Sequence, residues 1–161
     1  MSWTSEPDGL DKLRVDLPNH PHVTGETLWA QSMGNNLYEI RNVPFHAYGL
    51  NFLDIVVATT KGEDGLPTVE AVRRRSGHRT IRVCFTEDAL DEERLPILLN
   101  LHRDGGTFEG ASSSYYAIDV APEGNWERIC DTLATLREHG VVTFEMCESP
   151  ARTVFDVPAV T

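Results

Sequence analysis

The chain has 161 residues, of which 40% are hydrophobic, and its formal net charge is -11 at pH 7. This length and composition suit one generous globular domain or two small halves that share a core, and they argue against an intrinsically disordered chain. Nucleic-acid binding depends largely on Lys and Arg that release condensed counterions, so the negative charge argues against an RNA or DNA ligand. The same charge attracts cationic proteins.

The sequence also argues against membrane insertion and secretion. No apolar run approaches the ~20 residues that a membrane-spanning helix needs, and the first residues, MSWTSEPDGLDK, have neither a basic start nor an apolar signal core. Three cysteines are an odd number, which argues against a disulfide framework and fits a reducing compartment. We therefore expect a cytoplasmic protein with free thiols and no membrane partner.

The first half of the chain is a series of short strand-like segments separated by turn residues. Strand patterns occupy residues 12–17, 26–33, 37–43, 51–60 and 67–75. Gly34, Asn35 and Asn36 tolerate the positive φ values of a tight hairpin turn, and Pro44 and Gly49 lie where a sheet would bend. We predict a small antiparallel β-barrel-like half over residues 11–77.

The second half combines strands with two helices. Strand patterns at 78–85, 106–110, 114–121 and 141–147 surround a helix with Pro96 in its first turn and Gly105 or Gly106 at its end, and a helix that Asn125 caps and Gly140 ends. The order βαββαβ is ferredoxin-like. We predict this fold over residues 78–148, followed by a C-terminal tail at 149–161, so the chain as a whole is predicted to be α+β.

In a ferredoxin-like fold both helices cover one face of a sheet whose strands lie in the order fourth, first, third, second. Side chains alternate across a strand, so an apolar set should face the helices: Ile81, Val83, Phe85, Tyr116, Ile118, Val120, Val142, Phe144 and Met146. The opposite face is mixed, with His78, Thr80, Arg82, Cys84, Tyr115, Ala117, Asp119, Thr143, Glu145 and Cys147. We expect the N-terminal half or a second copy of the chain to cover this mixed face.

Arg82 lies at mid-strand on the mixed face, between strands that supply Asp119 and Glu145. Its guanidinium could bind a carboxylate-bearing or phosphorylated ligand. The alternative is an internal ion pair on a packed face. We place Arg82, Asp119, Glu145 and the loop histidine His46 in a candidate ligand-binding set.

A possible cysteine–histidine pair is the second candidate site. The first and fourth strands of the sheet should run antiparallel, which brings His78 toward Cys147, where a thiolate and its base could meet. The candidate catalytic set is therefore His78, Arg82, Tyr115 and Cys147.

Metal and cofactor motifs are lacking in the sequence. His20 and His22 flank Pro21 without a third or fourth ligand at a recognisable spacing. Phosphate-binding loops, nucleophile elbows and paired-cysteine motifs do not occur either. We expect neither a metal nor a cofactor.

Two stretches of the chain resemble a known family. GETLWAQSMGNNLYEIRNVPFHAYGLNFLDIVVA, followed by SGHRTIRV, is similar to an uncharacterised bacterial family, domain of unknown function 4265. Its members share an "E-lWA" pattern, an "NVPF-A-GL" pattern followed by "DvV", and an "SGH-T-R" pattern. Leu53 stands where the resemblance leads us to expect glycine. The resemblance implies a bacterial origin and gives no mechanism.

Two functional hypotheses remain open at the level of the sequence. The first is a small acidic binding protein that acts through a protein partner, for which a basic partner fits the charge; an inhibitor or an immunity-type antidote would be one form. The alternative is a small enzyme, for example in a bacterial biosynthetic pathway, with a pocket between the two halves that uses the candidate catalytic set. A homodimer is compatible with either hypothesis.

Overall fold

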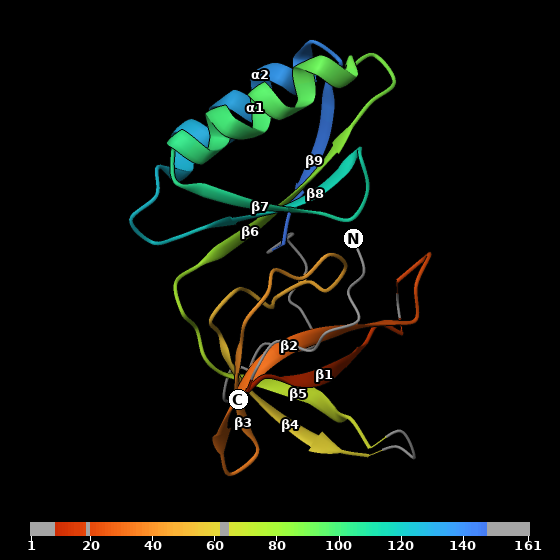
Figure 1. Ribbon diagram of the computed structural model, residues 1–161, viewed down its shortest axis with the longest axis vertical. Helices are drawn as coiled ribbons and strands as arrows, with labels where there is room; N and C mark the ends of the chain where they lie inside the picture. The colour runs from red at the N-terminus through yellow and green to blue at the C-terminus, as the bar shows by residue number, and fades with distance from the viewer. Residues whose placement is uncertain (1–8, 19, 62–64, 148–161) are drawn as a thin grey trace, which may run out of the picture.

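A computed structural model describes residues 9–18, 20–61 and 65–147. It contains two halves, a barrel at one end and a helix-covered sheet at the other (Figure 1). The order of elements confirms the predicted α+β class. The predicted tail at 149–161 lies outside the described residues.

The N-terminal half is a closed five-stranded barrel. Its strands are β1 (Asp11–Asp16), β2 (Gly25–Gly34), β3 (Leu37–Ile40), β4 (Ile55–Thr60) and β5 (Pro67–Arg74). Neighbouring strands pair antiparallel in chain order, and a parallel contact between β1 and β5 closes the ring. Alternate residues point inward into an apolar core, which includes Leu13, Val15, Leu28, Ile40 and Val56.

The hairpin turn predicted between β2 and β3 is confirmed. Gly34, Asn35 and Asn36 have φ values of 80°, 56° and 63°. Glycine and asparagine are the residues that adopt this left-handed conformation most easily, so the local sequence accounts for the turn.

Leu53 also adopts the left-handed conformation, with a φ of 66°. The bend that it forms is fixed by backbone hydrogen bonds from Leu53 to the Ile40 carbonyl at 2.8 Å and from Asp54 to the Asn51 carbonyl at 3.1 Å. Glycine would adopt this φ without strain, whereas an L-residue costs ~1–2 kcal/mol. Leu53 thus occupies a backbone conformation that glycine adopts more easily.

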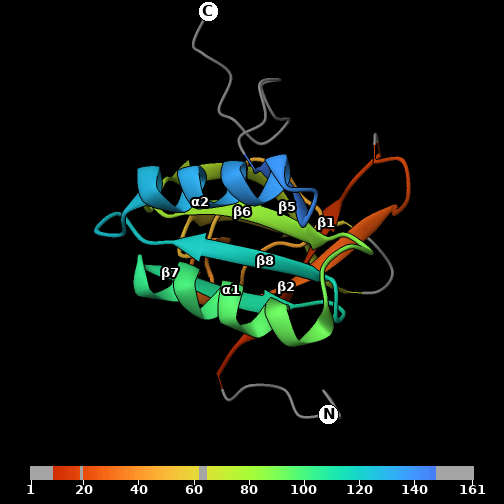
Figure 2. The ribbon, with the colours of Figure 1, turned by 90° about the horizontal axis from the view of Figure 1, so that it is seen from above.

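The C-terminal half has the predicted ferredoxin-like order. Its elements are β6 (Arg79–Phe85), α1 (Asp91–Arg103), β7 (Gly106–Gly110), β8 (Tyr115–Val120), α2 (Trp126–Glu138) and β9 (Val142–Met146). The strands lie in the spatial order β7-β8-β6-β9, as predicted. Both helices cover the face away from the barrel (Figure 2), and the core beneath them contains eight of the nine side chains predicted to face the helices, all except Met146.

The helix boundaries confirm one prediction and correct another. Asn125 caps α2, because its Oδ1 accepts a hydrogen bond from the Arg128 amide at 3.1 Å. The predicted start of α1 at Pro96 was wrong: the helix begins at Asp91, and Pro96 lies inside it. The acidic residues of the 91–93 turn suit the positive end of the helix dipole, and the exposed position of Pro96 lets water replace the hydrogen bond that proline cannot donate.

The described helices do not reach membrane-spanning dimensions: neither α1 nor α2 combines the length and the apolar character that a transmembrane helix needs.

Candidate functional site

A loop of the barrel covers part of the mixed face of the second sheet. Residues 41–54, which connect β3 to β4 and which we call the junction loop, lie between the barrel and the β6–β8–β9 strands (Figure 1). Ala117 is fully buried, as expected for a covered face, whereas Thr143 is exposed. The junction loop therefore covers one end of the face and leaves the other end open.

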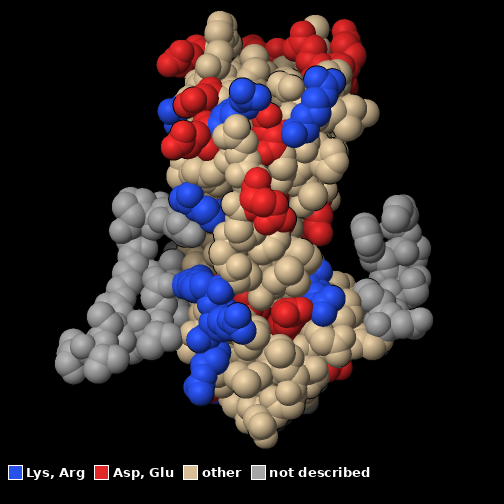
Figure 3. Space-filling view, turned by 90° about the vertical axis from the view of Figure 1, so that its left-hand side faces the viewer, with Lys and Arg blue, Asp and Glu red and all other residues tan. Residues whose placement is uncertain are grey.

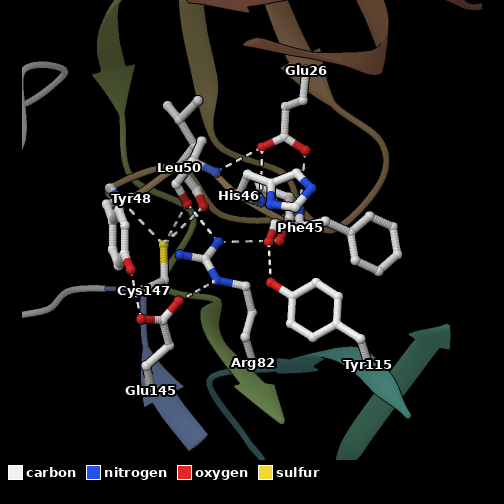
Figure 4. A network of polar contacts seen from close by, with 12 residues as sticks. Glu26, Phe45, His46, Tyr48, Leu50, Arg82, Tyr115, Glu145 and Cys147 are labelled. Atoms are coloured by element: carbon white, nitrogen blue, oxygen red, sulfur yellow. Dashed lines mark hydrogen bonds and ion pairs between the residues drawn. The ribbon is translucent and has the colours of Figure 1, made fainter. Parts of the chain in front are cut away.

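Glu26 holds the junction loop from the barrel side. Its carboxylate accepts hydrogen bonds from the backbone amides of Phe45, His46 and Ala47 at 3.1, 3.1 and 2.7 Å (Figure 4). One side chain thus satisfies three successive amides that would otherwise lack partners. The sequence contained a hint of this role, because Glu26 is the acidic residue of the "E-lWA" pattern.

Arg82 holds the loop from the opposite side. Its side chain is 1% exposed, and its Nη1 donates to the carbonyls of Ala47 at 2.6 Å and Pro44 at 3.4 Å. Its Nε pairs with Glu145 at 3.2 Å, and the Tyr48 ring lies over the guanidinium. Among the predicted partners of Arg82, Glu145 on β9 therefore makes the ion pair.

One nitrogen of the Arg82 guanidinium is left over by the contacts that the structure describes. Among the described residues its buried Nη2 has no hydrogen-bond partner, while Nη1 and Nε each donate a hydrogen bond. Buried polar atoms in this situation commonly bind ordered water. Nη2 could donate a further hydrogen bond. Nη1, the nitrogen that points toward the junction loop, already donates to loop carbonyls.

Two tyrosines complete this network. Tyr115 on β8 donates a hydrogen bond from its hydroxyl to the Phe45 carbonyl, and its ring stacks on His46. Burial raises the pKa of Tyr115 to about 12. Tyr48 donates to Glu145 at 2.5 Å, and its pKa is raised mainly by burial and next by this hydrogen bond. Both hydroxyls are thus protonated donors near neutral pH.

Cys147 lies under the junction loop and is fully buried. The Gly49 amide donates to its Sγ at 3.2 Å, and the thiol donates to the Leu50 carbonyl at 3.3 Å. A buried thiol in hydrogen-bonded contact with main-chain groups is typical of a structural cysteine rather than a nucleophile.

His78 pairs with a buried carboxylate. Its Nδ1 lies 3.0 and 2.9 Å from the two oxygens of Asp119, and its ring packs edge-on against Phe52. Burial raises the pKa of Asp119, and the hydrogen bond from His78 opposes this shift. The geometry fixes the Nδ1 edge of the imidazole and leaves Nε2 directed away from Asp119.

Ser76 and Thr80, two residues before and after His78, fix the end of the junction loop that contains Asn51 and Asp54. The Ser76 amide donates to Asp54 at 2.8 Å, and the Thr80 hydroxyl donates to Asn51 at 2.9 Å. Asp54 is fully buried, and burial raises its pKa despite the hydrogen bonds that oppose the shift. Three side chains of the second half, those of His78, Thr80 and Arg82, therefore contact the junction loop of the first half.

His46, the loop histidine of the candidate ligand-binding set, lies beside His20. Its ring lies 5.3 Å from that of His20, which is 6.1 Å from that of His22. Burial and the neighbouring His46 and His22 lower the pKa of His20. Within the described part of the chain, no three His, Cys, Asp or Glu side chains are arranged to hold a metal ion.

The candidate site residues therefore fall into two groups. Arg82, Tyr115, Glu145 and Cys147 meet at the junction loop together with His46, and their polar atoms largely bond to loop carbonyls or to one another. His78 and Asp119 form a separate pair farther along the same face. Sequence reasoning did not find Glu26, Tyr48, Asn51 or Asp54, which hold the loop.

The fold and this network define a class of protein in which a small barrel is joined to a ferredoxin-like sheet through hydrogen bonds of the junction loop. The chain belongs to the family described as "Domain of unknown function (DUF4265)", whose model matches residues 26–144. The match spans both halves, whereas the resemblance in the sequence was strongest before residue 84.

A solved structure has the same fold. The chain is similar to a hypothetical protein from Neisseria gonorrhoeae, with a TM-score of 0.69 and 19% sequence identity, over 84% of this chain and 92% of that chain. No curated protein sequence matches the chain.

Proposed function

We propose that the protein is a small acidic binding protein that acts through a cationic protein partner. The observation that supports this function is the uneven charge of the two halves. Residues 79–147 contain 13 Asp and Glu but 6 Lys and Arg, whereas residues 1–78 contain 10 and 7. Arg82 and Asp119 are both buried, so leaving them out of the comparison keeps the same acidic excess at the surface of the second half. An inhibitor or an immunity-type antidote would be one form of such a protein.

The outer face of α2 is the part of this acidic surface that we assign to the partner. Glu127, Asp131 and Glu138 are exposed and share one side of the helix at helical spacing. Figure 3 shows acidic side chains gathered at the helical end of the molecule, with some Lys or Arg side chains among them, and Lys and Arg along the barrel. Such a surface accelerates association with a cationic partner, and salt screens the effect.

The test compares two variants that lose the same charge. Glu127→Gln, Asp131→Asn and Glu138→Gln are combined in one, and the exposed Asp11→Asn, Glu87→Gln and Glu93→Gln in the other. The immobilised wild type and both variants are each incubated with an extract of the producing organism. We expect the wild type and the matched variant to retain a protein that the α2 variant does not bind. The association rate of that protein, once purified, should fall as salt rises. Equal retention by the two variants, or a rate independent of salt, would contradict the proposal.

A second candidate function, an enzyme, is supported by the His78–Asp119 pair. A carboxylate that holds Nδ1 orients the imidazole for proton transfer at Nε2. Arg82, Tyr115 and Cys147 support this candidate less, because the junction loop engages them. The test compares which metabolites disappear from a small-molecule extract when wild-type or variant protein is added. We expect a His78→Gln variant to stay folded but no longer to consume the metabolite that the wild type removes. His102→Gln is the matched control, and equal consumption by both variants would reject the catalytic role of His78.

A further inference from the structure

The two helices that cover the second sheet have different outer faces. Charged residues dominate the outer face of α2, as solvent requires. The outer face of α1 instead carries Leu95 and Leu99, which are 55% and 46% exposed, beside the exposed Pro96. Leu98 and Leu101 fill the side of α1 that faces the sheet, so the middle of this helix, residues 95–101, is apolar on both sides apart from Asn100. An exposed apolar patch rimmed by polar residues marks an interaction site, which indicates that another surface covers the middle of α1.

Charged residues lie at both ends of the exposed leucine stripe. Glu92, Leu95, Pro96, Leu99 and Arg103 are spaced by three or four residues, and so they follow one line along the helix. The first turn of α1 is acidic, and its last turn contains His102 and Arg103. The stripe therefore has a negative end, an apolar centre and a positive end.

We propose that this stripe binds a second copy of the chain, with the two α1 helices antiparallel about a two-fold axis near residues 97 and 98. In this arrangement Leu95, Pro96 and Leu99 pack against the same residues of the copy. Glu92 faces the partner subunit's Arg103. Each contact occurs twice, because a two-fold interface is formed by the same patch on both subunits.

The charge pattern favours this occupant over a cationic segment of another protein. A uniformly basic segment would complement the acidic first turn but would repel His102 and Arg103 at the other end. An antiparallel copy complements both ends at once. A single helix pair is a small interface, so the dimer should depend on protein concentration.

The experiment measures mass by sedimentation across a concentration series that extends into the hundreds of micromolar. We expect wild-type protein to reach twice the 18.0 kDa mass of the chain. Leu99→Glu should weaken the dimer at least about tenfold, whereas Thr135→Glu on the outer face of α2 should leave it unchanged. Glu92→Arg and Arg103→Glu should each weaken the dimer, and the double variant should restore it.

Three results would overturn the proposal. A monomer at every concentration would show that α1 is not a self-association surface, whether or not it captures a cationic peptide. A dimer that Leu99→Glu does not weaken would place the interface elsewhere. A dimer that loses affinity in both single charge variants and is not restored in the double variant would exclude the antiparallel register. The inference is independent of the acidic α2 face, so either proposal can fail while the other holds.

Discussion

Replacing Arg82 by lysine tests whether the junction loop depends on a guanidinium or only on a positive charge. In Arg82, different nitrogens of the planar guanidinium donate to the Ala47 carbonyl and to Glu145. Lysine keeps the charge, but its single ammonium group cannot reach both acceptors in this geometry. We expect the folded protein to form but with a lower free energy of unfolding.

The size of the loss follows from the contacts of Arg82. The side chain is 1% exposed, so solvent does not replace the lost bonds. A charge-assisted hydrogen bond to a buried carbonyl contributes ~1.5–3 kcal/mol. The Glu145 side chain is 45% exposed, so its ion pair contributes about 0–1 kcal/mol. Arg82→Lys should therefore cost about 2–3 kcal/mol, or roughly 4–12 °C in Tm for a chain of this size.

Urea unfolding of Arg82→Lys beside Glu145→Gln measures this difference. Glu145→Gln removes the charge of the exposed partner and leaves the carbonyl contacts of Arg82 intact, so it should cost about 1 kcal/mol or less. The reasoning would be refuted if Arg82→Lys were no less stable than Glu145→Gln.

Three further predictions concern the backbone, the histidines and the thiols. Leu53→Gly should be more stable than Leu53→Ala by roughly 0.5–1 kcal/mol in urea unfolding, because both lose the side chain but only glycine relieves the left-handed strain; equal stabilities would contradict this. The pKa of His20 is lowered from 6.5 in the folded protein, so the unfolded chain takes up its proton first and stability should decline as pH falls through 6.5. His20→Asn keeps an acceptor for the turn and should flatten this decline, and an unchanged pH profile would exclude His20 as its source. A thiol reagent should modify the exposed Cys84 in native protein, whereas the buried Cys147 should react only on unfolding; fast native labelling of a Cys84→Ser variant at Cys147 would revive the nucleophile hypothesis.

The alternation of apolar residues was sufficient to predict the second sheet. Ile81, Val83 and Phe85 face the helices because side chains alternate along a strand whatever the neighbouring strands are. The start of α1 was predicted too late because Pro96 was assigned to a first turn. Proline is tolerated deeper in a helix when, as here, it is exposed and removes one hydrogen bond that water replaces.

The contacts of the site depend on information that a single sequence lacks. Pairing between strands, with Thr80 opposite Asp119 and Arg82 opposite Glu145, decides which carboxylate meets Arg82. The sequence supplied both candidates but not this register. Glu26 was missed because an acidic residue in a half-buried strand has no periodicity that distinguishes it from solvent-facing neighbours, although its carboxylate binds three amides of a loop about 20 residues later.

The junction loop also constrains the order in which the chain can become native during synthesis. The Gly49 amide bonds to a cysteine 98 residues later, and the Ala47 carbonyl bonds to an arginine 35 residues later. The barrel strands are complete at residue 74, so they can pair while the later residues are still being added by the ribosome. The loop between β3 and β4 cannot reach its final conformation until β9 has emerged. The junction loop is therefore the last part of the first half to reach its native conformation, although it is translated before more than half of the chain.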